Sequence, residues 1–293
     1  MEFALSNNKA NRSTMTALGW QIEYAVWTNA NDSKEEVPVV VGFHGFARPL
    51  EDLITVHEAW PEAHTMISIH LPHHGASRPI ADSGPIDQPI SPSTLNQIIE
   101  AIIEREVPNG SQRTLLGYSI GGRIAMALTA DAPVKWNQLV LLAPDGLKKS
   151  PFYTLTVHTR LGRWIWFFID RNEKKVWKWT DILYKWGLIS QHLHGFAYFH
   201  TESHEMRMMV WNGWRSHREC WPSHRSIVKS LTQVPRVKLI FGEFDKIIPY
   251  HKSKRLRKLT QWLEHVSFHA IRSGHNMLKP ETTKAIIRII FDS

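Results

Sequence analysis

Short apolar runs alternate along the chain with longer segments in which apolar residues recur at helical spacing. The runs at 37–43 and 65–71 are apolar almost throughout, which is typical of strands covered on both faces of a parallel sheet. Residues 20–28, rich in Trp, Tyr, Val and Ile, form the first segment with strand character. We predict further strands at 112–118, 138–143, 237–241 and 266–271.

Helices are predicted between these strands. Residues 51–60 have helical spacing and end before Pro61, and Ser93 is a suitable N-cap for a helix through Glu106. The other helical segments are 120–130, 250–263 and 280–291. This alternation predicts an α/β fold, a three-layer sandwich in which helices cover both faces of a mostly parallel sheet.

The segment 147–225 interrupts the alternation, because it has a helical pattern with long aromatic stretches and no clear strand. We therefore predict that residues 1–146 and 226–293 form the core and that 147–225 form a helical cap, or lid, inserted into it. The chain of 293 residues is long enough for a core with such an inserted subdomain.

Composition narrows the protein class. No run of 18 apolar residues appears, so a membrane-spanning helix is not expected, and the polar N-terminus lacks the apolar stretch of a secretory signal. With Cys220 as its single cysteine, the chain forms no internal disulfide, which fits a reducing compartment. We expect a cytoplasmic protein.

Positive charge is concentrated in the predicted cap. The whole chain has a net charge of +8, and residues 147–225 contain 13 Lys and Arg against 6 Asp and Glu, a local charge of +7. The same segment holds 8 of the 13 tryptophans. Such a surface attracts an anionic substrate, an anionic membrane or nucleic acid, although a solvated basic face over a small Trp-filled core explains it equally well.

The pentapeptide Gly117-Tyr118-Ser119-Ile120-Gly121 is the first candidate for chemistry. An apolar strand precedes it and an apolar helix follows, which is the setting of a nucleophile elbow. The flanking glycines permit a sharp turn, and the helix N-terminus favours negative charge at Ser119. The alternative is a glycine-rich turn whose serine only caps the helix.

A serine nucleophile needs a base and an acid that orients the base, and this fold places them in the order Ser, Asp or Glu, His. Asp245 follows one predicted strand and His275 follows the last one, so we predict the triad Ser119, Asp245 and His275. Glu243 is the alternative acid. For the oxyanion hole we predict the backbone N–H groups of Ile120 and Phe46, the latter in the loop after the 37–43 strand.

The other histidines are interpreted as structural. His265 and His269 fall beside or within a strand, so they are weaker candidates for the base. His70, His73 and His74 lie close together, but no cysteine or carboxylate cluster accompanies them, so we predict no metal site.

These pieces resemble the α/β-hydrolase superfamily, in particular its capped, meta-cleavage-product-hydrolase-like branch. The matching pieces are His44-Gly45-Phe46, Leu71-Pro72-His73-His74-Gly75-Ala76-Ser77, the elbow with Gly122, Asp245, and Gly274-His275. In many relatives a glycine stands at the position of His73. The resemblance implies an eight-stranded sheet, a cap inserted after the sixth strand and no cofactor.

The elbow is also similar to that of the menaquinone-pathway synthase that eliminates pyruvate with the same triad. There the arginine after the double glycine helps to bind an anionic substrate, which implies a similar role for Arg123. Our candidates for contact with a small-molecule substrate are His44, Arg123, Trp164 and Trp211.

The aromatic and basic stretch at 163–179 has two further interpretations. It resembles an interfacial membrane helix, but we prefer a cap helix that packs Trp and Phe over the active site. No nucleic-acid motif accompanies it, so we expect no nucleic-acid partner. The sequence leaves the oligomeric state open.

The leading functional hypothesis is hydrolysis of a carboxylic ester through an acyl-enzyme. The first alternative keeps the same residues for hydrolysis of a carbon–carbon bond, or for an elimination, on an anionic substrate. The second is a ligand-binding protein on a hydrolase scaffold with slow turnover.

Overall fold

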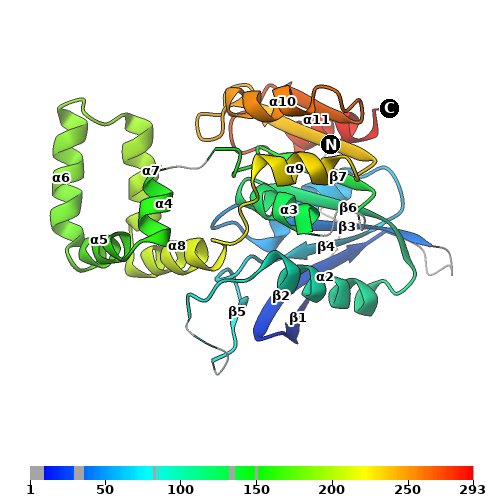
Figure 1. The fold of residues 1–293 in the computed structure, drawn as a ribbon, viewed down its shortest axis with the longest axis horizontal. Helices are drawn as coiled ribbons and strands as arrows, with labels where there is room; N and C mark the ends of the chain where they lie inside the picture. Colours follow the sequence, from blue (N-terminus) through cyan, green and yellow to red (C-terminus); the bar gives the residue numbers. More distant parts are fainter. Residues whose placement is uncertain are drawn as a thin grey trace, which may run out of the picture.

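A nine-stranded sheet organises the molecule in the computed structural model, which describes residues 10–29, 36–81, 84, 86–131, 136–148 and 151–292 (Figure 1). Eight strands follow the order β1-β2-β4-β3-β6-β7-β8-β9, and the two-residue β5 pairs with β2. The strands are β1 Asn11–Ala17, β2 Trp20–Thr28, β3 Val37–Phe43, β4 Thr65–Ile69, β5 Arg78–Pro79, β6 Gly110–Tyr118, β7 Gln138–Leu142, β8 Arg236–Gly242 and β9 Val266–Ile271.

The sheet is parallel from β4 through β9, whereas β2 runs antiparallel to β1, β4 and β5. This confirms the predicted α/β fold with a mostly parallel sheet. The sequence analysis did not identify β1, because its alternating exposed and half-buried positions carry mainly polar residues. Among the strands that the structure describes, β1 pairs with β2 only, so it has one strand neighbour and little apolar surface to bury.

Helices cover both faces of the sheet. One buried cluster joins α2, α3 and α9 to one face, and a second joins α1 and α11 to the other. The helices around the sheet are η1 Leu50–Leu53, α1 Ile54–Ala59, α2 Pro92–Glu106, α3 Ile120–Asp131, α9 His224–Leu231, η4 Tyr250–Ser253, α10 Lys254–Thr260 and α11 Pro280–Phe291.

The N-cap of α2 differs from the prediction. Ser91, not Ser93, caps the helix, and its hydroxyl accepts a hydrogen bond of 3.0 Å from the Thr94 N–H. Pro92 occupies the first helical position, where its fixed backbone angle and missing N–H cost nothing. The Ser91-Pro92 pair was therefore the better signal for the start of this helix.

Six helices of the described residues lie between β7 and β8, and we call the first five of them the helical insertion (residues 151–216). They project to one side of the sheet, with α6 farthest from it (Figure 1). They are α4 Pro151–His158, α5 Arg160–Arg171, α6 Glu173–Lys185, α7 Gln191–Thr201 and α8 His204–Ser216. The next helix, α9, packs against α3 in the sandwich. The division into core and cap at residues 146 and 226 stays a prediction.

Candidate active site

Ser119 is the single residue that links β6 to α3. Its φ angle of +55° is in the left-handed region that residues with a Cβ seldom adopt. Hydrogen bonds on both sides hold this conformation, since the Ser119 N–H donates to the Leu142 carbonyl at 2.9 Å and its carbonyl accepts from the Asp145 N–H at 2.9 Å. The strained turn is thus fixed by the neighbouring strand β7 and the loop after it.

Close backbone approach explains the glycines around Ser119. A Cβ on Gly117 would lie 2.6 Å from the Gly121 carbonyl oxygen, and one on Gly121 would lie 2.4 Å from the Phe43 carbonyl oxygen. Both contacts are with backbone that has no room to move. The Gly-x-Ser-x-Gly spacing is therefore required by the packing of α3 against β6 and β3.

A continuous chain of hydrogen bonds joins the three predicted triad residues. Ser119 Oγ lies 3.1 Å from His275 Nε2, and His275 Nδ1 lies 2.7 Å from Asp245 Oδ2. An ionised carboxylate only accepts, so the Nδ1 of a neutral ring carries the proton and Nε2 is left to accept from the serine hydroxyl. This arrangement is the one in which an imidazole can act as a base toward Ser119.

Asp245 is held as an ionised acceptor. Its side chain is fully buried, and its second oxygen, Oδ1, accepts hydrogen bonds of 2.8 Å from the N–H groups of Ile247 and Ile248. Burial by itself raises the pKa of Asp245, but the hydrogen bond and charge of His275 and the two backbone N–H groups outweigh it and lower the pKa. Glu243, the alternative acid, is exposed.

Tyr118 contacts His275, and the sequence analysis did not identify this contact. Its hydroxyl donates to the His275 backbone carbonyl at 2.8 Å, and the two rings lie 5.5 Å apart between centroids. The residue before Ser119 thereby holds the loop that carries His275. A buried tyrosine hydroxyl needs a partner, but the sequence does not say which one.

The predicted oxyanion residues follow two neighbouring elements, Ile120 coming directly after Ser119 and Phe46 after β3, the strand that pairs with β6. Ile120 begins α3, so its N–H belongs to the first helical turn, where backbone donors have no partner within the helix. Phe46 lies in the loop after β3, and its ring contacts the His74 ring at 5.2 Å between centroids. Their role as the oxyanion hole stays a prediction.

Two buried histidines support the loop that carries Phe46. His44 Nε2 accepts from the Leu71 N–H at 3.2 Å, and its Nδ1 donates to the Gly45 carbonyl at 2.7 Å. His74 Nε2 accepts from the Ala47 N–H at 3.0 Å. Burial lowers the pKa of both rings, that of His74 to about 4, so both are neutral. His44 uses both ring nitrogens inside the protein, which leaves no nitrogen for the predicted substrate contact.

His73 occupies a strained position. Its φ of +64° is in the left-handed region that glycine adopts freely, which accounts for the glycine found there in many relatives. The ring lies within hydrogen-bond distance of Ser216 at the end of α8, with His73 Nε2 3.1 Å from the serine Oγ. The side chain therefore connects this loop to the helical insertion.

Arg123 is buried beside this region. Its Nη1 donates to Asp145 Oδ2 at 3.3 Å, and its guanidinium lies over the Tyr153 and Trp221 rings, 5.1 and 4.5 Å from their centroids. Within the described residues, Arg123 Nε and Nη2 and both ring nitrogens of the buried His217 have no hydrogen-bond partner. Such orphaned buried groups are uncommon and suggest a ligand or water.

The two tryptophan candidates have different surroundings. Trp211 of α8 is buried with Trp166 of α5, and Phe46 packs against this cluster. Trp164 lies on the opposite face of α5, where it is 64 % exposed and stacks on Phe168. The structure therefore brings Trp211 to the loop that carries Phe46 and does not bring Trp164 there.

Comparisons with known proteins agree with this geometry. A sequence profile described as the alpha/beta hydrolase family matches residues 40–285, most of the chain. The chain belongs to the alpha/beta hydrolase family. It is accordingly a hydrolase enzyme, as predicted, whereas its assignment to the meta-cleavage-product-hydrolase-like branch stays a prediction.

One curated relative matches part of this hydrolase. The pimeloyl-[acyl-carrier protein] methyl ester esterase of Nitrosomonas europaea is 33 % identical over 106 residues, which is 36 % of this chain. The matched region spans 37 % of that relative's length.

Solved structures of low sequence identity share the fold. An alpha/beta hydrolase enzyme from a Medee basin deep-sea metagenome library is 16 % identical, with a TM-score of 0.64 over 95 % of this chain and 97 % of that one. A thermophilic esterase from Thermogutta terrifontis is 15 % identical, with a TM-score of 0.61 over 96 % and 97 % of the two chains.

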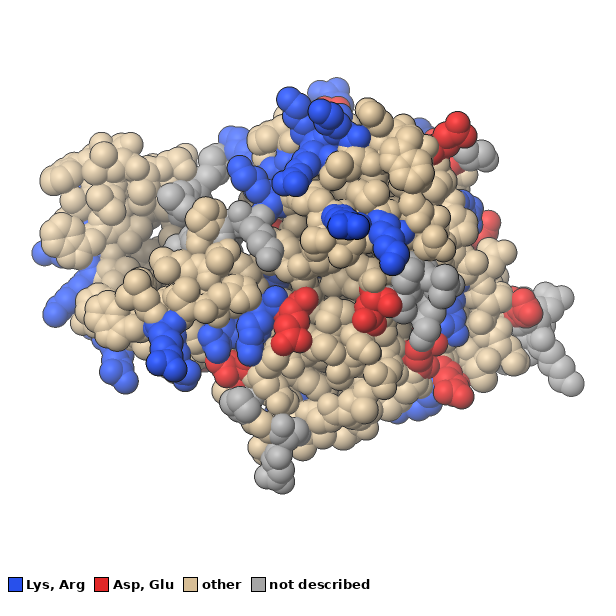
Figure 2. Space-filling view, in the orientation of Figure 1, with Lys and Arg blue, Asp and Glu red and all other residues tan. Residues whose placement is uncertain are grey.

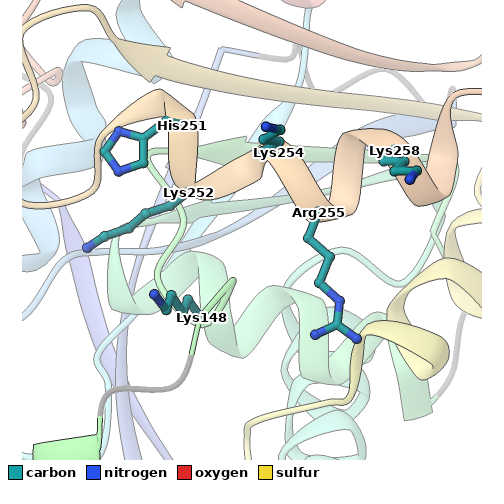
Figure 3. Close-up of a pocket in the computed structure, with 6 residues that line it drawn as sticks. All are labelled: Lys148, His251, Lys252, Lys254, Arg255 and Lys258. Atoms are coloured by element: carbon teal, nitrogen blue, oxygen red, sulfur yellow. The ribbon is translucent and has the colours of Figure 1, made fainter.

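A basic cavity of about 460 Å³ opens on the surface of this hydrolase (Figure 3). Its walls come from Lys148, in the loop three residues after Asp145, and from η4 and α10, which follow the Asp245 loop. The lining residues are Lys148, His251, Lys252, Lys254, Arg255 and Lys258. No triad residue lines it, so it is separate from the candidate active site.

Proposed function

We propose that this hydrolase is a serine hydrolase that cleaves carboxylic esters through an acyl-enzyme. The observation that carries the proposal is the hydrogen-bonded chain from Ser119 Oγ through His275 to the buried Asp245. The partial match to a methyl ester esterase supports an ester as the substrate class.

Each residue then has one task. The Ser119 hydroxyl attacks the acyl carbonyl while His275 Nε2 accepts its proton. Asp245 stabilises the imidazolium that results, and the N–H groups of Phe46 and Ile120 bind the oxyanion. His275 passes the proton to the leaving alkoxide, and a water activated by the same ring then hydrolyses the acyl-enzyme.

A fluorophosphonate probe tests whether this triad is active. The probe forms a stable phosphonyl ester only with an activated serine, so we expect labelling on the peptide that contains Ser119, detected by mass spectrometry. His275→Ala is expected to abolish the labelling, because it removes the base. His251→Ala, which changes an exposed histidine of η4, is the matched control and should label like the wild type. An unlabelled, folded wild-type protein would instead support a binding protein on a hydrolase scaffold.

A second candidate concerns the charge of the substrate. Arg123 and His217 are buried, and among the described residues the donors Nε and Nη2 of Arg123 and both ring nitrogens of His217 have no hydrogen-bond partner. These groups favour a substrate that carries an anionic group. The triad residues would then act on an anionic ester, or they would catalyse the carbon–carbon hydrolysis or the elimination considered above.

A matched pair of substrates tests this candidate. We expect a half-ester with a free carboxylate to have a lower KM than the neutral diester of the same length. Arg123→Gln should raise KM for the half-ester by about 10- to 100-fold, the usual cost of losing a hydrogen bond to a charged group. The diester is the internal control. Equal losses on both substrates would show that Arg123 has only a structural role.

A further inference from the structure

The outer face of α5 is apolar and exposed. Leu161, Trp164 and Phe168 recur at helical spacing on this face, and the Trp164 and Phe168 rings stack with centroids 5.7 Å apart. The opposite face already packs on α8 through the buried Trp166. Burial within this chain therefore does not account for the apolar residues of the outer face.

The next helix, α6, repeats the pattern. Trp179, Leu183 and Trp186 follow one another at spacings of four and three residues along its axis, and the two tryptophans are 64 % and 73 % exposed. No residue of α6 is buried. Two consecutive helices therefore each present an apolar, Trp-containing stripe to solvent, which is unusual for a surface with no partner.

Cations accompany both stripes. Between residues 160 and 188 the chain has seven Lys and Arg and three acidic residues. All three acids are in ion pairs within the helical insertion, Asp170 and Glu173 with Arg207 and Asp181 with His194. The seven cations form none of the ion pairs found in the described ranges: they are Arg160, Arg163, Arg171, Lys174, Lys175, Lys178 and Lys185. In Figure 2, Lys and Arg side chains follow the edge of the insertion.

The exposed aromatic stripes and the cations beside them indicate which kind of partner binds α5 and α6. Aromatic side chains that lie at the boundary of lipid and water, flanked by Lys and Arg that face phosphate headgroups, are the chemistry of interfacial helices. A second copy of the chain fits less well, because it would bring two sets of unpaired cations together. Across the described ranges every helix is too short or too polar to cross a bilayer.

We propose that α5 and α6 dock this hydrolase on the surface of an anionic lipid bilayer. The stripes Leu161-Trp164-Phe168 and Trp179-Leu183-Trp186 enter the headgroup region, and the seven cations contact the lipid phosphates. This reverses our preference from the sequence, in which these aromatic residues covered the active site, because Trp164 and Trp179 are on the outside.

Vesicle flotation with the full chain tests the proposal. We expect the protein to float with vesicles of phosphatidylcholine mixed with phosphatidylglycerol, to stay behind with phosphatidylcholine alone, and to be released by salt. The double variant Trp164→Ser/Phe168→Ser should weaken binding by about tenfold or more. Trp262→Ser removes an equally exposed tryptophan near α10 and is the matched control, expected to bind like the wild type.

Charge reversal separates a docking surface from a general effect of net charge. Lys175→Glu/Lys178→Glu on α6 should weaken vesicle binding, whereas Lys254→Glu/Lys258→Glu at the basic cavity changes the net charge equally and should not. Equal losses in both variants, or equal binding to neutral vesicles, would overturn the proposal. The proposal would also be overturned if light scattering showed that the wild-type protein is a dimer and that the Trp164→Ser/Phe168→Ser variant is a monomer. Hydrolysis of a water-soluble ester reports on the triad independently of these outcomes.

Discussion

Ser119→Ala is expected to lower kcat for ester hydrolysis by about 10⁶-fold, the loss seen when the serine nucleophile is removed from such a triad. Alanine keeps the Cβ, so the strained φ of +55° and the packing of the elbow stay as they are. Only the hydroxyl that lies 3.1 Å from His275 Nε2 is lost. Steady-state kinetics with a p-nitrophenyl ester measures the effect.

The matched control is Ser93→Ala, which removes an exposed hydroxyl from the first turn of α2. It should leave kcat within about twofold of the wild type, since surface substitutions seldom disturb a protein. Circular dichroism should show both variants folded. A Ser119→Ala protein with near-normal turnover would exclude Ser119 as the nucleophile.

Stability is expected to fall steeply between pH 6.5 and pH 4. Burial lowers the pKa of nine of the described histidines from the ordinary value of 6.5. Five of these shifts are large, to about 4 for His57, His73 and His74 and well below 6.5 for His44 and His217. The unfolded chain therefore binds protons in this range that the folded chain excludes. Stability is retained above pH 6.5 and is lost as the pH falls toward the folded-state values.

The free energy of unfolding is expected to depend steeply on pH in this range. Each such histidine contributes up to about 1.4 kcal/mol per pH unit, so the five together contribute up to roughly 7 kcal/mol per pH unit. A domain has a total stability of about 5 to 15 kcal/mol, so unfolding is expected near pH 5. Asp245 acts in the same direction at lower pH, because its pKa is depressed below the ordinary range of an aspartate.

Urea unfolding at a series of pH values measures this slope. His57→Gln removes one of the five histidines. It should reduce the number of protons taken up on unfolding, which sets the slope, by about one. Gln261→Ala, which changes an exposed residue without an ionisable group, should leave the slope unchanged. A free energy of unfolding that stays constant from pH 6.5 to pH 4.5 would contradict the prediction.

The sequence predicted those features whose structural environment leaves a local pattern of residues. Parallel strands are buried on both faces, so β3 and β4 appear as continuous apolar runs. The glycines around Ser119 are required by backbone contacts, and such contacts appear in the sequence as glycine itself. The order of Ser119, Asp245 and His275 then followed from strand ends that meet at one edge of the sheet.

Features that depend on tertiary packing were not predictable. β1 is polar because its strand neighbour is on one side only, and nothing in its composition marks it as part of the sheet. Trp164 and Trp166 look alike in the sequence, yet one is exposed and the other buried, because the rotation of α5 against α8 decides their surroundings. The hydrogen bond from Tyr118 to His275 joins residues that are 157 positions apart.

The bonds that hold Ser119 limit how this scaffold can be re-engineered. Leu142 and Asp145 bind the backbone of Ser119 on both sides, and the helical insertion begins at Pro151, a few residues later. Exchanging the insertion for one from another enzyme must therefore leave residues 142–145 untouched. A graft whose junction lies inside this stretch would remove these hydrogen bonds, and the chimera would lose the backbone conformation of Ser119 however well the new helices pack.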